Sequence, residues 1–241
     1  MILLALAGCL DRLLESPYVL APGLGEVRSV AARADGQLVV ATGTGVYAVD
    51  WEGRAERIED TPADAVSTHP DRLFVLRGGR VTWPGGGVDL PGAVDILGGY
   101  DDRLVALYPD ALELLDLAAG TRVRLPLGVP DARTVALGPE GAYLVVTEHT
   151  LLSIAVDGTI ATLARDLVDA RAAAVDPKGR VYVAQGDPED LWRVDGPALT
   201  SIARWLGDPR DLHFGFGAHL PPENAYVANG TGTLDYVRPP P

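Results

Sequence analysis

Short apolar stretches separated by tight polar turns recur along most of the chain. Each stretch is rich in β-branched or aromatic residues and directly follows a turn, which is the pattern of a short β-strand. The six stretches are QLVVAT (37–42), RLFVLR (72–77), RLVALY (103–108), AYLVVT (142–147), RVYVAQ (180–185) and NAYVAN (224–229). A small-residue apolar run precedes each turn, so the pattern predicts a second strand on the other side of it.

The turns repeat at a regular interval along the chain. Consecutive turns lie 31 to 45 residues apart, and a period near 40 residues indicates a propeller or solenoid. The turns are Asp35-Gly36, Pro70-Asp71, Asp101-Asp102, Glu140-Gly141, Lys178-Gly179 and Glu223-Asn224. We therefore predict an all-β fold, a six-bladed β-propeller of four-stranded antiparallel blades, as one domain over residues 17–241.

Helical repeats of similar period are disfavoured. They require apolar positions spaced at 3.6 residues over about a dozen residues, and the frequent glycines and prolines break such a pattern. The chain holds 28 glycines and 19 prolines, with no collagen-like period.

The two ends of the repeat region complement each other. After the strands at 224–229 and 233–238 the chain ends in Pro239-Pro240-Pro241, which leaves the last blade one strand short. Pro17-Tyr18-Val19-Leu20-Ala21 is strand-like and belongs to no repeat. We predict that this N-terminal strand completes the last blade and closes the ring.

Composition limits the partners. The formal net charge is −13, and nucleic-acid binding depends on clustered lysine and arginine, so we expect no nucleic-acid partner. Cys9 is the single cysteine, which excludes an internal disulfide and a thiolate metal cluster. We expect a monomer.

The first sixteen residues form a separate segment. An apolar run ends in Leu6-Ala7-Gly8-Cys9, which resembles the lipobox of bacterial lipoproteins, so we expect residues 1–16 to be a signal and tether lipidated at Cys9. The protein would then be exported and held at the bacterial cell envelope or in the periplasm, meeting the membrane only through the lipid. No lysine or arginine precedes the apolar run, although a secretory signal normally carries one.

The alternative is a short amphipathic helix in a cytoplasmic protein. Its apolar face would consist of Leu3, Leu6, Leu10, Leu13 and Leu14.

Three stretches carry a family resemblance. AVDPKGRVYVA, ALGPEGAYLVV and GFGAHLPPENAYVAN resemble the repeats of the senescence-marker/gluconolactonase propellers and, more loosely, the NHL-type propellers. The resemblance implies one divalent cation, most often calcium, held by carboxylate and amide oxygens at the starts of the innermost strands. In that family the cation polarises a sugar lactone and activates water.

An acid and an arginine, two residues apart, recur in three blades. The arginines stand eight residues before Gly36, Gly141 and Gly179, where the resemblance implies a metal ligand. A guanidinium has no lone pair for a metal. The three steps are Glu26-Val27-Arg28, Asp131-Ala132-Arg133 and Asp169-Ala170-Arg171.

These steps admit three interpretations. In the first, the steps form inter-blade salt bridges or caps. In the second, they bind an anionic ligand at the channel mouth. In the third, the acids Glu26, Asp131 and Asp169 hold a cation. Glu26 also lies in GLGEV, which resembles the family's opening G-E-G-P, so a longer turn would make it the ligand itself. Because arginine occupies the expected positions, we predict no metal, with one calcium ion as the alternative.

Histidine supplies one further candidate. His213 lies beside Asp211 and Arg210 in GDPRDLHFGFG, so it is the candidate general base at the mouth. We expect the inter-blade loops to bring further acids and His149 to the same end. Those acids are Asp64, Asp95, Asp110, Asp131, Asp169, Asp187, Asp190, Asp208 and Asp211.

The sequence therefore favours a propeller that binds an unidentified small molecule or protein at its mouth, or serves as a scaffold. A metal-dependent sugar-lactone hydrolase is the alternative, and a structural envelope protein is the third hypothesis.

Overall fold

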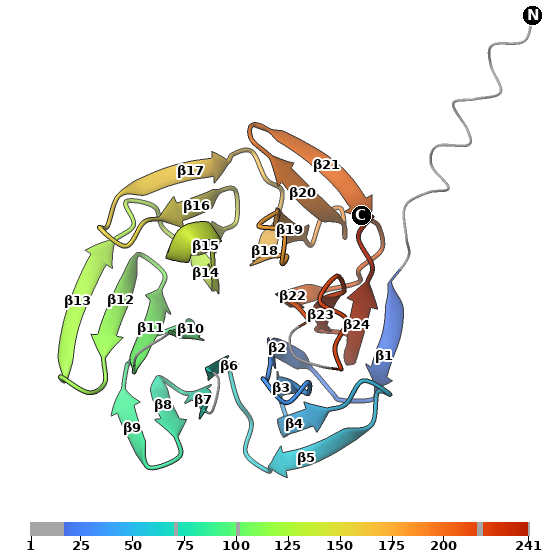
Figure 1. The fold of residues 1–241 in the computed structure, drawn as a ribbon, viewed down its shortest axis with the longest axis horizontal. Helices are drawn as coiled ribbons and strands as arrows, with labels where there is room; N and C mark the ends of the chain where they lie inside the picture. Colours follow the sequence, from blue (N-terminus) through green and yellow to red (C-terminus); the bar gives the residue numbers. More distant parts are fainter. Residues whose placement is uncertain (1–16, 70–71, 100–101, 216–218, 241) are drawn as a thin grey trace, which may run out of the picture.

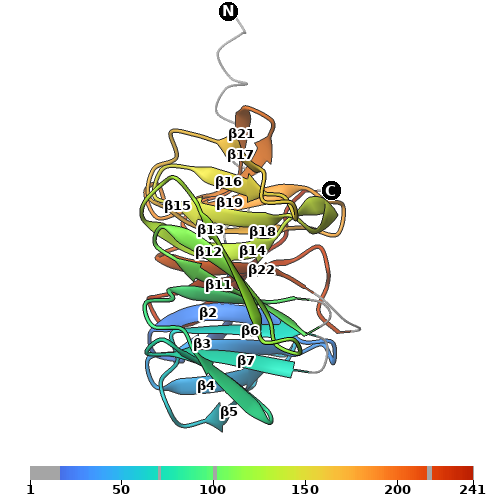
Figure 2. The ribbon, with the colours of Figure 1, turned by 90° about the vertical axis from the view of Figure 1, so that its left-hand side faces the viewer.

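The computed structural model describes residues 17–69, 72–99, 102–215 and 219–240. Six four-stranded antiparallel sheets surround a central axis (Figure 1), and seen from its edge the ring is narrower along that axis than across it (Figure 2). The predicted six-bladed β-propeller is confirmed. The lipobox ending at Cys9, the alternative helix over residues 1–16 and the turn residues 70–71 and 101 lie outside the described residues.

Each blade runs from the axis outward in chain order. Blade one holds β2 (Val27–Ala32), β3 (Leu38–Thr42), β4 (Gly45–Val49) and β5 (Ala55–Glu59). Blade two holds β6 (Ala65–His69), β7 (Arg72–Arg77), β8 (Arg80–Trp83) and β9 (Gly86–Asp89). Blade three holds β10 (Asp95–Gly98), β11 (Arg103–Tyr108), β12 (Ala111–Asp116) and β13 (Thr121–Pro126).

The second half of the ring repeats this order. Blade four holds β14 (Ala132–Leu137), β15 (Tyr143–Thr147), β16 (Leu151–Ile154) and β17 (Ile160–Ala164), with the short 3-10 turn η2 (Pro139–Gly141) after β14. Blade five holds β18 (Ala170–Val175), β19 (Val181–Gln185), β20 (Leu191–Asp195) and β21 (Ala198–Ala203). Blade six holds β22 (Pro209–Phe214), β23 (Ala225–Asn229) and β24 (Thr233–Val237). All six predicted apolar strands are present as the second strands of their blades.

The N-terminal strand β1 (Tyr18–Pro22) is the fourth strand of blade six. It pairs antiparallel with β24 at the outer edge of that blade, where the two lie side by side (Figure 1). The predicted ring closure is therefore confirmed.

The hydrophobic core lies between blades. Among the described residues, six buried clusters each join two neighbouring blades. One of them packs Tyr182 of blade five against Phe214 of blade six, with ring centroids 5.1 Å apart. Because every blade buries both faces, its inner strands carry continuous apolar runs. In the described part of the chain, no helix has the length and hydrophobicity to cross a membrane.

Candidate functional site

The starts of the six innermost strands surround a cavity of 410 Å³ at one end of the ring, here called the mouth cavity. Four arginines line it, one each from blades one, four, five and six. They are Arg28, Arg133, Arg171 and Arg210. Three of these were predicted, whereas Arg210 was missed.

A β-bulge positions each of the four arginines. In blade one, Val27 pairs with Thr42 and Ser29 pairs with Ala41, which leaves Arg28 as the extra, unpaired residue. The same register shift falls at the other three arginines. Bulges re-aim side chains at strand ends, and they direct these guanidinium groups to the mouth. Strands β6 and β10 pair without a shift and contain no arginine.

In three blades the arginine forms an ion pair with the acid two residues before it. Nη2 of Arg28 lies 2.8 Å from Glu26, and the corresponding distance is 2.6 Å for Arg171 and Asp169. In blade six, Nη2 of Arg210 lies 2.5 Å from Asp208. The acid-x-arginine step is therefore also present in blade six, as Asp208-Pro209-Arg210, where it was not predicted.

Glycine makes room for these pairs. Gly43, Gly186 and Gly230 follow the second strand and donate their N–H to the backbone carbonyl of the acid. A Cβ on Gly186 would lie only 2.5 Å from the carboxylate of Asp169. The absence of a Cβ at these glycines thus leaves space for the carboxylate of each acid to lie over the loop and pair with its arginine.

Blade four differs, because Glu148 occupies the position of that glycine. Glu148 itself lies 3.0 Å from Nη2 of Arg133, whereas Asp131 is exposed and does not line the mouth cavity. Arg133 also reaches Asp169 of blade five at 2.6 Å. Among the described contacts, blade four thus lacks the acid–arginine pair of blades one, five and six.

Two of the arginines connect neighbouring blades. Arg28 lies 3.3 Å from Asp64 of blade two, and Arg133 joins blades four and five through Asp169. Partial burial of Asp169 opposes its ionisation, but hydrogen bonds from Arg133 and Arg171 outweigh that effect and lower its pKa. This geometry supports the inter-blade salt-bridge interpretation, and it does not prevent the same arginines from also facing a ligand.

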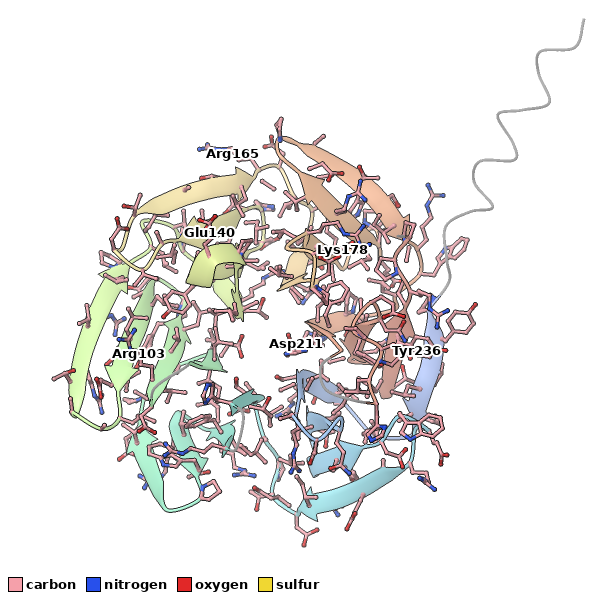
Figure 3. All side chains as sticks on the ribbon, viewed as in Figure 1. Arg103, Glu140, Arg165, Lys178, Asp211 and Tyr236 are labelled. Carbon is pink, nitrogen blue, oxygen red and sulfur yellow. The ribbon has the colours of Figure 1, made fainter. Side chains whose placement is uncertain are left out.

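Two carboxylates lie deeper in the channel, on opposite blades: Asp95 is buried and Asp211 is half-buried. Asp95 of blade three accepts N–H groups from Ile96 and from Val135 of blade four, both at 2.8 Å. Asp211 of blade six, at the centre of the ring in Figure 3, accepts the N–H of Val30 at 2.9 Å. Each carboxylate therefore accepts a backbone hydrogen bond from the next blade around the ring.

Burial raises the pKa of both acids. For Asp95, desolvation acts first and repulsion from Asp211 adds to it, and the pKa rises well above its ordinary value. For Asp211, desolvation again exceeds the opposing hydrogen bonds, which come first from Val30 and then from Ser29. In the sequence both residues were indistinguishable from the other loop acids.

We expect Asp95→Asn to change the pH dependence of stability. Because the native pKa is raised, the native state binds the proton more tightly, so the Asp95 contribution is fully present below the ordinary carboxyl pKa. It is lost as pH rises through the raised pKa. Asparagine lacks one acceptor and should lower stability by about 2 kcal/mol at acidic pH.

The measurement for this prediction is chemical denaturation of both proteins across a pH series. The stability difference between wild type and Asp95→Asn should shrink as pH rises. Asp211→Asn should give a slope of the same sign, since the pKa of Asp211 is also raised. A difference that stays constant with pH would contradict the assignment.

His213 lines a different cavity from the arginines. This second cavity, of 510 Å³, lies on the other side of Asp95 and Asp211, which line both. His213 Nδ1 lies 2.5 Å from the carbonyl oxygen of Phe214. Burial lowers its pKa, despite that hydrogen bond and the nearby Asp211. The expectation that His213 joins the mouth is therefore wrong, and the mouth cavity is lined by no histidine among the described residues.

The acids do not form a cation site in the described parts of the chain. Within these residues no three histidine, cysteine or acidic side chains converge on one point. The carboxylates of Glu26 and Asp169 form ion pairs with Arg28 and Arg171. Asp131 and Asp169, moreover, do not line the mouth cavity. The residues of the mouth thus do not fit a divalent cation of the kind that the family resemblance implies.

Neither a family model nor a curated protein matches this sequence. Solved structures, in contrast, match most of the chain. A gluconolactonase from Xanthomonas campestris has a TM-score of 0.72 at 17% identity, over 92% of this chain and 89% of that one. A calcium-binding protein, regucalcin, from Agrobacterium tumefaciens has a TM-score of 0.68 at 13% identity, over 92% of each chain.

A streptogramin B lyase has a TM-score of 0.69 at 11% identity, over 92% of this chain and 96% of the other. At these identities the similarity concerns the fold. The expected resemblance to gluconolactonase-type propellers is confirmed at that level.

Proposed function

We propose that this propeller is a binding module that holds a small hydroxylated organic anion at its mouth without the help of a metal. The observation that carries the proposal is the convergence of four bulge arginines on one cavity. Guanidinium groups bind carboxylates and phosphates through paired, charge-assisted hydrogen bonds. The cavity volume of 410 Å³ suits a small molecule.

Arg171 and Arg210 retain donors for such a ligand. Each contacts its own acid through Nε and Nη2. Among the described residues, Nη1 of neither arginine makes a hydrogen bond to protein. Both side chains line the mouth cavity, so these free donors supply the anion-binding part of the site.

The carboxylates of the mouth favour a ligand that also carries hydroxyl groups. Glu26, Asp64 and Asp211 line the cavity beside the arginines, and ionised carboxylates accept several hydrogen bonds each. These carboxylates would repel an anion that lacks hydroxyl groups, whereas hydroxyl groups on the ligand can donate hydrogen bonds to the carboxylates. A hydroxylated carboxylate satisfies both kinds of side chain.

A metal-dependent lactone hydrolase is the second candidate, supported by the fold shared with the gluconolactonase. It is disfavoured because Glu26, Asp169 and Asp208 pair with arginines and, among the described residues, no three acidic or histidine side chains converge on one point.

Calorimetric titration distinguishes the two functions. With chelator present, we expect gluconate to bind saturably, glucose to bind at least tenfold more weakly, and hexanoate to bind weakly because it lacks hydroxyl groups. Calcium should leave the gluconate affinity unchanged. Calcium-dependent hydrolysis of gluconolactone, lost in Glu26→Gln, would support the hydrolase instead.

Export and lipid attachment through Cys9 are the second part of the proposal. They rest on the apolar run that ends in Leu6-Ala7-Gly8-Cys9. Labelled palmitate should be incorporated in a bacterial host and should be absent from Cys9→Ser. Equal labelling of both proteins would refute attachment at Cys9.

A further inference from the structure

The cavity on the far side of Asp95 and Asp211, here called the rear cavity, is different in chemistry from the mouth. All six innermost strands contribute to its wall. Small and apolar residues predominate, among them Val30, Ala32, Ile96, Val135, Ala174 and Phe214. Small side chains near the axis leave the volume of 510 Å³ open.

Most polar groups in this wall already have partners. The Ser67 hydroxyl accepts the N–H of Gly98 at 2.7 Å, and Thr68 donates to the carbonyl of Ala32 at 2.5 Å. Asp176 is ion-paired with Arg180 at 2.6 Å. The acids that remain to interact with a ligand are Asp95 and Asp211, at the inner end of the cavity.

No lysine or arginine stands beside those two acids in the described lining of the rear cavity; the titratable neighbour of Asp211 there is His213, whose pKa is lowered by burial. Four arginines, in contrast, line the mouth. Asp95 and Asp211 accept backbone N–H groups, and carboxylate oxygens can accept further hydrogen bonds. The rear cavity thus has apolar walls and an acidic inner end.

We propose that the rear cavity is a second ligand site, for a small apolar amine whose hydrocarbon body packs on the walls and whose ammonium group binds Asp95 and Asp211. Apolar pockets with a few convergent polar groups are the usual form of a small-molecule site. Burial and mutual repulsion raise the pKa of Asp95, and a ligand ammonium between the two acids would relieve that repulsion.

Three probes that share a six-carbon chain but differ in the charge of the head group separate the contribution of charge from that of hydrophobic contact. We expect hexylamine to bind saturably with one site per chain, hexanol to bind at least tenfold more weakly, and hexanoate to show no binding beyond its weak association with the mouth. Calorimetry at neutral pH measures all three. Absence of saturable hexylamine binding, or equal affinity for hexanol, would overturn the proposal.

Variants locate the site. Asp95→Asn with Asp211→Asn should reduce hexylamine affinity to that of hexanol. Because these substitutions also weaken two blade contacts, Ala34→Trp provides an independent test: Ala34 is exposed and lines the rear cavity, so the indole should block entry without disturbing the core. Ala118→Trp, in an exposed turn outside the cavity, is the matched control.

The expected result is loss of hexylamine binding in Ala34→Trp and wild-type affinity in Ala118→Trp. Gluconate binding at the mouth should be unchanged in both, which separates this proposal from the proposed function. Hexylamine binding that survives Ala34→Trp would place the amine elsewhere and overturn the assignment.

Discussion

Deletion of residues 17–22 is expected to lower the free energy of unfolding by about 3–5 kcal/mol, through lost strand pairing and lost burial. For a chain of this size the melting temperature should fall by roughly 10 °C. Thermal unfolding followed by circular dichroism measures the change, together with the width of the transition.

The contacts of β1 explain this size of effect. Ala21 is fully buried opposite Leu234, and Leu20 packs on the cluster between blades six and one. Tyr18 stacks on Tyr236 with ring centroids 5.3 Å apart. Without β1, the β24 edge of blade six would be exposed and the connection that leads from β1 into blade one would be lost.

A point-substituted pair controls for the deletion itself. Ala21→Asp places a charge in the buried β1–β24 contact and should destabilise strongly, whereas Val19→Thr, at a position 58% exposed, should leave the melting temperature nearly unchanged. A synthetic peptide of residues 17–24 should partly restore the deleted protein by adding a strand. An unchanged transition after deletion would show that β1 does not close the ring.

The combined substitution Arg171→Ala with Arg210→Ala is expected to weaken gluconate binding at least 100-fold. A hydrogen bond to a charged group contributes about 1.5–3 kcal/mol, so each arginine should account for a factor of roughly ten or more. Stability should change little, because both ion pairs are partly exposed to solvent and solvent-screened pairs contribute at most about 1 kcal/mol. Calorimetry gives the affinity, and thermal unfolding checks the fold.

Two comparisons make this result specific. Arg193→Ala removes an arginine that also pairs with an acid two residues away, Asp195 at 2.9 Å, but Arg193 does not line the mouth cavity, so gluconate affinity should be unchanged. Arg171→Lys with Arg210→Lys keeps the charge but not the paired donors, and should give an intermediate affinity. Equal losses in all three variants would indicate a non-specific charge effect.

The strands and their order could be predicted from the sequence because each blade repeats the same local pattern. QLVVAT and its five counterparts are short, apolar and bounded by turns, and in the structure they are second strands with buried side chains. The unpaired strand at Pro17–Ala21 was predictable for the same reason, since the last blade lacked one strand.

The site was harder to predict because it depends on departures from that pattern. Counting from a turn glycine assumes a regular strand, whereas each arginine is the extra residue of a bulge. Arg210 was missed because it stands 14 residues before Asn224 instead of eight. Yet Asp208-Pro209-Arg210 has the same spacing as the other steps, which was the available signal.

Blade four illustrates a second limit. Asp131 and Asp169 have the same local sequence, Asp-Ala-Arg, but only Asp169 faces a glycine across the loop. The partner position in blade four, Glu148, lies 17 residues further along the chain. Glu148 contacts Arg133 only once the chain has folded. In the same way, only folding places Asp95 and Asp211 in one channel.

Titration of gluconate into the wild-type protein and the Arg171→Ala/Arg210→Ala variant, both in the presence of chelator, tests most directly whether the mouth arginines hold an anion without a metal. We predict saturable binding to the wild type and at least 100-fold weaker binding to the variant. Binding that requires added calcium, or equal affinity of the two proteins, would contradict the account.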